Sequence, residues 1–156
     1  DDNPTFTLAQ QIYKTIPVIY GETDATGTLA VRFKGQLSEN AKMLAYCNEL
    51  PEMNHNEIVG FKNNQDILNH ISVIWLKDKK DHPRTALRRE STQEIISDLC
   101  ANHEVLSAEG DSATTRFLHL IHYGDWLSYW CAILHRTDPT PVKNIDRLKA
   151  ILSEKS

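Results

Sequence analysis

The chain has 156 residues, of which 40% are apolar and 24% are charged, and its 17 basic and 21 acidic side chains leave a net charge of −4. This length and composition are typical of one compact globular domain, and they exclude a disordered or collagen-like chain. The negative net charge argues against a nucleic-acid-binding protein, which needs a cationic face.

The predicted elements alternate between strands and helices along the chain. Short β-branched runs closed by Gly or a polar turn favour buried strands, and apolar residues at helical spacing separate them. The predicted strands cover residues 16–20, 71–76 and 104–107, and the predicted helices cover residues 7–15, 28–37, 54–61, 83–100, 112–135 and 142–153. Ser38 is expected to cap a separate short helix, and residues 43–50 fit either a helix end or a further strand.

This alternation predicts a three-layer α/β sandwich of flavodoxin-like type, with a parallel sheet covered by helices on both faces. Residues 1–156 contain no repeat and no linker-like segment, so we expect a single domain. The apolar stretches are interrupted well short of a membrane span, and residues 1–5 lack the basic and apolar character of a signal peptide. We therefore expect no membrane partner.

The three cysteines, Cys47, Cys100 and Cys131, are far apart and form no Cys-x-x-Cys pair. This pattern argues against a disulfide framework and against a cysteine zinc site, and it favours a cytoplasmic location.

The polar loop of residues 21–27 follows a predicted strand and precedes a predicted helix, where open α/β sheets bind ligands. Its amides, together with Thr26 and Thr28, are candidates for contact with an anion at the helix N-terminus. An ordinary strand-to-helix connection accounts for the same residues.

Glu39 and Lys42 lie three residues apart, a spacing that suits either a surface ion pair or a general base with a cation beside it. His55 lies in a polar segment, which favours a solvent-exposed or proton-transferring histidine over a core residue.

His119, His122 and Asp125 have a spacing that a helical metal site would also show. Apolar residues interleave with them, so helix packing is the simpler interpretation and no metal is expected. The aromatic residues Trp126, Tyr129 and Trp130 follow on the same helix, and they favour a core or subunit contact over a ligand site.

Two segments of the chain resemble the bifunctional phosphoglucose/phosphomannose isomerases. The first combines residues 38–42 (Ser-Glu-Asn-Ala-Lys) with residues 50–60, which contain Asn-His-Asn-Glu at 54–57. The second combines residues 124–130 with the Asp-Pro-Thr-Pro-Val run at 138–142 and residues 145–149. The resemblance extends over nearly the whole chain from residue 16 onward.

The resemblance implies an aldose-ketose isomerase that interconverts glucose 6-phosphate and fructose 6-phosphate, and also mannose 6-phosphate, through a cis-enediol without a metal or cofactor. By motif match Glu39 is the base, and His55 assists ring opening in the site of a neighbouring subunit. The match places the active-site lysine at Lys149, with Lys143 as an alternative, and the threonine that accommodates mannose at Thr140. Apart from the resemblance, Lys42 is a candidate substrate-binding cation because it lies close to Glu39.

Members of this family carry two SIS (sugar isomerase) domains in tandem, and this chain resembles the second. The resemblance therefore implies a missing N-terminal SIS domain that holds the phosphate cradle and an arginine, a homodimer, and little activity for this chain alone. A local cationic pocket, from Arg32, Lys34, Lys42 or Arg116, would have to offset the negative net charge. A non-catalytic SIS module that senses a phosphosugar, and a metal-dependent hydrolase built on the two helical histidines, are the alternative functions.

Overall fold

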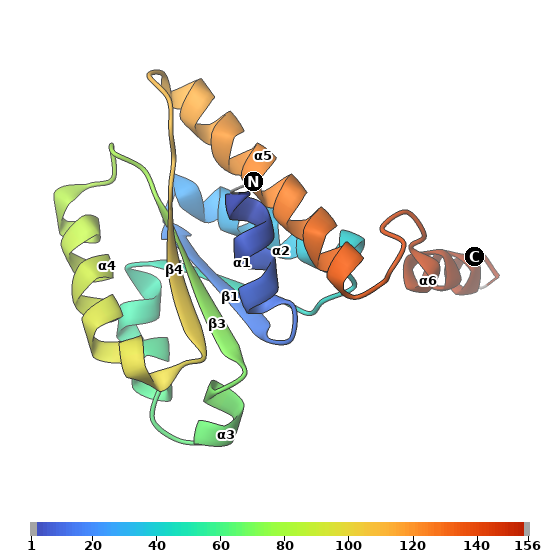
Figure 1. The fold of residues 1–156 in the computed structure, drawn as a ribbon, viewed down its shortest axis with the longest axis horizontal. Helices are drawn as coiled ribbons and strands as arrows, with labels where there is room; N and C mark the ends of the chain where they lie inside the picture. The colour runs from blue at the N-terminus through green and yellow to red at the C-terminus, as the bar shows by residue number, and fades with distance from the viewer. Residues whose placement is uncertain (1–2, 155–156) are drawn as a thin grey trace.

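The parallel sheet is the centre of the computed structural model, which describes residues 3–154 (Figure 1). Its four strands run in the order β2-β1-β3-β4, and Val18 lies beside Tyr46 of β2 and Val73 of β3. All three strand pairings are parallel, so the predicted sheet is confirmed. The strands are β1 (Ile16–Glu22), β2 (Tyr46–Leu50), β3 (Ile71–Lys77) and β4 (Asn102–Ser107).

Three helices cover one face of the sheet: α1 (Pro4–Ile12), α2 (Thr26–Asn40) and α5 (Ala113–Leu134). Their apolar sides form one core with the strands, in which Phe33 and Leu120 are almost fully buried. Gly124 lies where α5 crosses α2, and a Cβ atom there would come within 2.7 Å of the Phe33 ring. The close approach of the two helices therefore depends on the missing side chain.

Three 3-10 turns and two helices cover the opposite face, so the predicted three layers are confirmed. Met53, Trp75 and Ile96 are fully buried in the core between these elements and the sheet. The elements are the 3-10 turns η1 (Glu52–His55), η2 (Glu57–Gly60) and η3 (Ser97–Leu99), and the helices α3 (Gln65–Leu68) and α4 (Pro83–Ile96).

The prediction that Ser38 begins a new helix is wrong. α2 runs without a break from Thr26 to Asn40, because Leu37 continues its buried side and accepts a backbone hydrogen bond from Ala41. The chain leaves the helix at Lys42, whose φ of 56° lies in the left-handed region. Residues 43–50, for which a helix end and a strand were both open, contain β2 from Tyr46 onward.

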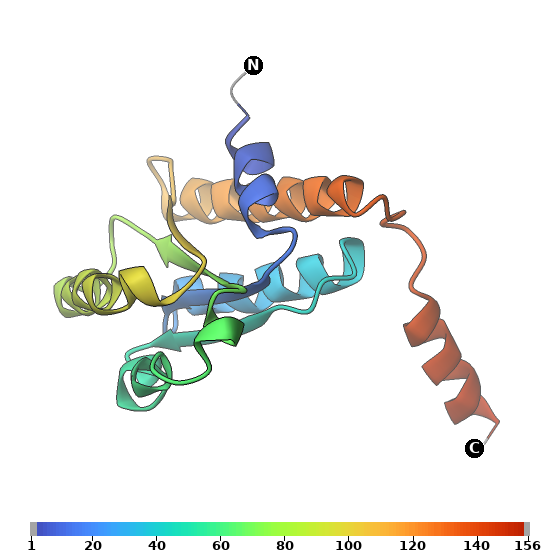
Figure 2. The same ribbon diagram turned by 60° about the horizontal axis from the view of Figure 1, so that its bottom comes forward.

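The last helix, α6 (Lys143–Ser153), stands away from the sheet and its covering helices (Figure 2). No residue of α6 is buried. Among residues 3–154, no helix combines the length and the apolar character that a membrane crossing would require.

Candidate functional site

Glu39 lies in the last turn of α2, at the amino edge of the sheet. α2 begins after the carboxyl end of β1 and returns across the sheet before β2, so its C-terminus lies where the strands start. The Glu39 side chain is exposed, whereas Leu37, two residues earlier, is buried in the core. The core therefore fixes the backbone that presents this carboxylate to solvent.

Lys42 connects the end of α2 to the segment between α5 and α6. Its Nζ donates a hydrogen bond to the carbonyl oxygen of Glu39 and another, of 3.0 Å, to the carbonyl oxygen of Pro139. The two backbone segments are thereby held together around the Glu39 side chain.

An open pocket of about 630 Å³ lies between the end of α2 and the start of α6. Glu39 and Lys42 contribute charged groups on the α2 side, Lys143 contributes one on the α6 side, and Asp138 contributes a carboxylate from the segment before α6. The remaining lining residues are Ser38, Thr137, Pro141, Val142, Asn144 and Ile145. This pocket brings together a candidate base and two candidate cations.

Lys149 and Thr140 do not line this pocket. Lys149 lies further along α6. Thr140 lines a neighbouring hollow of about 590 Å³ with Asn40, Asp125 and Tyr129. Lys143, the alternative lysine, is the one that lines the pocket with Glu39 in this arrangement.

His55 lies at the opposite edge of the sheet from Glu39. It ends η1, which follows the carboxyl end of β2, and its side chain is exposed. Since Glu39 lies at the amino edge, one copy of the chain does not bring these two side chains together.

The segment that carries His55 is anchored firmly to the sheet by the residues beside it. The Glu57 carboxylate accepts hydrogen bonds from the Tyr20 hydroxyl (2.8 Å) and from Nδ2 of Asn48 (2.7 Å), and Nδ2 of Asn54 donates to Oγ1 of Thr92 (2.8 Å). Burial, and then the nearby Glu57 charge, raise the pKa of Tyr20, so its hydroxyl remains a donor. His55 is thus an exposed ring on a fixed backbone.

The loop before α2 is shorter than expected, because β1 extends to Glu22 and α2 begins at Thr26. Thr26 is fully buried, and its hydroxyl accepts a hydrogen bond from the Glu22 amide (2.8 Å). Thr28 is exposed and donates to the Ala25 carbonyl, while the Glu49 carboxylate lies against Gly27. The Thr26 hydroxyl is already hydrogen-bonded inside the protein, and the Glu49 carboxylate would repel a phosphate. Both features are unfavourable for binding a phosphate here.

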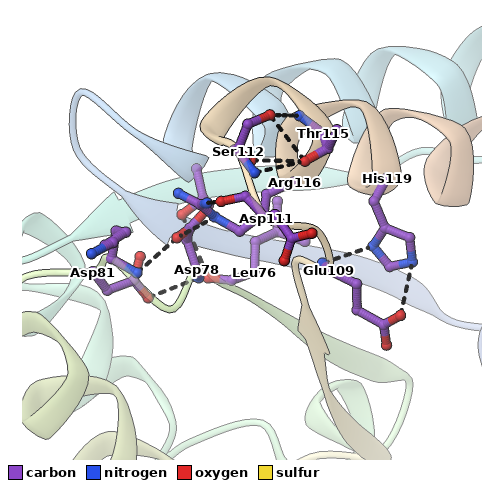
Figure 3. A network of polar contacts seen from close by, with 11 residues as sticks. Leu76, Asp78, Asp81, Glu109, Asp111, Ser112, Thr115, Arg116 and His119 are labelled. Atoms are coloured by element: carbon purple, nitrogen blue, oxygen red, sulfur yellow. Dashed lines mark hydrogen bonds and ion pairs between the residues drawn. The ribbon is translucent and has the colours of Figure 1, made fainter.

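The carboxyl edge of the sheet holds two buried ion pairs. Arg116 donates to both carboxylate oxygens of Asp78 (3.0 and 2.8 Å) and to the Asp111 carbonyl (3.3 Å), as Figure 3 shows. Arg89 pairs with Asp81 at 2.6 Å, and both side chains are almost fully buried. Arg116 is therefore neutralised inside the protein and does not supply the cationic pocket that the sequence suggested.

The pKa of Asp78 reflects this environment. Burial favours its neutral form, but the hydrogen bond from Arg116, the Lys80 amide and the Arg116 charge together outweigh burial, so the pKa is lowered. Asp78 could not be predicted as the partner of Arg116, because 38 residues separate them and no local pattern links them. The sequence signal that could have pointed to Asp78 is its place in the polar turn that follows β3.

The metal site considered for α5 is not assembled. His122 accepts a hydrogen bond from Nε1 of Trp126, Asp125 pairs with Arg32, and His119 accepts one from the Glu109 amide (Figure 3). Across residues 3–154, no three His, Cys, Asp or Glu side chains are grouped to hold a metal ion. Trp126 and Tyr129 remain substantially exposed, so they are not core residues of this chain.

Comparison with known proteins gives a consistent result. A family model described as "Bacterial phospho-glucose isomerase C-terminal SIS domain" matches residues 1–152. Two curated relatives named "Bifunctional phosphoglucose/phosphomannose isomerase" are similar to this chain over 147 residues, which is 94% of its length. The one from Caldicellulosiruptor bescii is 40% identical and the one from Aquifex aeolicus 42% identical.

The chain spans about half the length of these relatives, 43% and 45% respectively. Among solved structures, a "glucose-6-phosphate isomerase like protein" from Thermus thermophilus superposes with a TM-score of 0.71 at 20% identity. The match covers 88% of this chain and 45% of that one. At this identity the likeness establishes the fold alone.

Proposed function

Because this chain belongs to the family of bacterial phosphoglucose isomerase C-terminal SIS domains, we propose that it supplies half of an isomerase active site for hexose 6-phosphates. The other half would come from an N-terminal SIS domain and from a second copy of the chain. The observation that supports this division is the position of Glu39 and His55 at opposite edges of one sheet, both exposed.

Glu39 is the proposed base. Its carboxylate removes the proton from C2 of the open-chain aldose, and a proton is added to O1 as the cis-enediol forms. The proton then returns to C1 while O2 loses its own, which gives the ketose. A base placed over two adjacent carbons needs access from the pocket, and the exposed Glu39 side chain at its rim provides that access.

The remaining polar groups have supporting roles in the proposal. His55 of the neighbouring copy assists ring opening, and a lysine from α6, Lys149 or Lys143, stabilises the charge that develops on the enediol oxygens. Lys42 contacts the sugar from the pocket, and Thr140 contacts it from the neighbouring hollow. Thr26 and Thr28 have the weakest support, because both lie at the opposite end of α2 from Glu39 and Thr26 is buried. The phosphate cradle belongs to the N-terminal domain.

The test is a complementation assay with the full-length polypeptide. Glu39→Gln and His55→Ala variants are each expected to be nearly inactive in a coupled assay of fructose 6-phosphate conversion. When the two are unfolded, mixed and refolded together, random dimers should recover about a quarter of the wild-type activity, since half of the dimers then contain one intact site. No recovery would show that both residues act from one copy, and full activity of either variant would remove that residue from the mechanism.

The same assay on this chain alone addresses the half-site proposal. Activity only in the full-length polypeptide is the expected result. Activity in the isolated chain would show that the phosphate site lies within these residues.

A further inference from the structure

α6 has an apolar side that nothing in residues 3–154 covers. Ile145, Leu148 and Ile151 recur every three residues along this helix, and they are 41%, 56% and 40% exposed. Residues at this spacing lie on one side of a helix, whereas Asp146 lies on the opposite side. The helix is therefore amphipathic, with its apolar side in solvent.

An 11-residue helix in this position needs a partner surface. Isolated helices shorter than about 12–15 residues are marginal in water, and most helical stability in proteins comes from packing of the apolar side. The apolar side of α6 is typical of a helix that packs against a protein surface, yet no residue of α6 is buried.

The tether of α6 positions it at the pocket. Lys42 holds the preceding segment through the Pro139 carbonyl, and the first turn of α6 lines the pocket that contains Glu39. The helix therefore projects from the edge of the sheet where the proposed site needs a second protein surface.

We propose that α6 is an arm whose apolar side docks onto the N-terminal half of the same polypeptide. More than half of the length of the two curated relatives lies outside the region that this chain matches, so a covalently linked surface of sufficient size is available. Three aliphatic side chains bury much less surface than a stable interface between separate molecules, in which each partner contributes about 800 Å². A covalently linked surface needs no such area, because its effective concentration is high.

This docking has a consequence for the choice of lysine. Lys149 follows Ile145 by four residues and so lies beside it on the helix. A docked α6 holds Lys149 at the boundary with the N-terminal half, where the phosphosugar would bind. This consequence, and the existence of the N-terminal half itself, rest on the proposed function.

The first experiment identifies the surface that covers α6 in the full-length polypeptide. A benzophenone amino acid is placed at position 148, and copies with natural isotopes and ¹⁵N-labelled copies are unfolded, mixed and refolded together before irradiation, so that mixed dimers form. We expect cross-links to peptides of the N-terminal half with both peptides from the same copy. Cross-links that join light and heavy copies would assign the surface to a second copy and overturn the proposal, as would the absence of any cross-link to the N-terminal half.

The second experiment measures amide hydrogen exchange of α6 in the same polypeptide. Leu148→Asp is compared with Leu118→Asp, a matched control on α5 whose side chain is also 56% exposed. We expect α6 amides in the Leu148→Asp variant to exchange on the order of tenfold or more faster than in the wild type, and to be unchanged in the control. Equal exchange in all three proteins would overturn the proposal. Neither readout uses substrate, so a failure of docking and a failure of the isomerase proposal are separate results.

Discussion

At the carboxyl edge of the sheet Arg116 is buried against Asp78, whereas at the amino edge Glu39 and Lys42 lie in solvent beside an open pocket. Open α/β sheets ordinarily bind ligands at the carboxyl ends of their strands, where the strand order reverses. Here that reversal lies between β1 and β3, and the groups next to it are paired with one another. The fold alone would therefore direct attention to the carboxyl edge, whereas the candidate pocket with Glu39 lies at the amino edge.

This difference between the edges separates groups that hold the fold from groups that are available for chemistry. The two ion pairs of the carboxyl edge, Asp78 with Arg116 and Asp81 with Arg89, are buried inside the chain, and removing one partner leaves a buried charge. The pocket residues of the amino edge are exposed, and removing one costs the fold little. Stability and activity should accordingly respond to different substitutions.

The largest expected effect is on activity at the amino edge. Glu39→Gln should lower kcat of the full-length polypeptide by about 10²–10⁴-fold, the usual contribution of a general base. Its free energy of unfolding should change by less than about 0.5 kcal/mol, because the side chain is exposed. Steady-state kinetics and urea denaturation of the same preparation check both values. A destabilised protein would place Glu39 among the structural residues instead.

Substitution at the carboxyl edge should show the opposite pattern. Asp78→Asn removes the charge partner of Arg116 and should destabilise the fold by about 3–5 kcal/mol, as when one member of a buried ion pair is lost. Urea denaturation measures the change. The matched control is Asp125→Asn, which breaks an ion pair with Arg32 that is about 40% exposed on both sides and should cost less than about 1 kcal/mol.

The Asp78 contribution should also depend on pH. The folded-state pKa of Asp78 lies below its unfolded value of about 3.9, so its contribution is complete above that pH and is lost as the pH falls through the folded-state pKa. The difference in stability between wild type and Asp78→Asn should therefore be constant from pH 7 to about pH 5 and narrow below about pH 4. A constant difference down to about pH 3 would contradict this account.

The smallest predicted effect concerns the anchor of the His55 segment. Tyr20→Phe removes the hydroxyl that donates to Glu57, and it should cost about 1 kcal/mol of stability, the typical net value of one such hydrogen bond. Tyr46→Phe, at an exposed tyrosine of the adjacent strand, serves as the control and should be nearly neutral. If both variants are equally stable, the Tyr20–Glu57 contact does not hold this segment in place.

Several features of the molecule could be predicted from the sequence because their causes are local. Strand β3 lies where its β-branched residues predicted it. Helix α5, which Ser112 caps, also lies where the apolar residues at helical spacing predicted it. Local signals failed where packing overrides them. Ser38 has the side chain of an N-cap, yet the buried Leu37 keeps α2 continuous through it. Similarly, the Thr26 hydroxyl could bind an anion, but it is buried and accepts a hydrogen bond from the Glu22 amide.

The sequence by itself determined the family of the chain, the parallel α/β fold and the candidate residues Glu39 and His55, since all of these rest on residue types and their order. Only the tertiary structure decided which of the charged groups are free for a substrate. Arg116 and Asp78 are far apart in the sequence and meet only because the first turn of α5 lies beside the turn that follows β3. Glu39 and His55 are close in the sequence, but the return of α2 across the sheet places them at opposite edges.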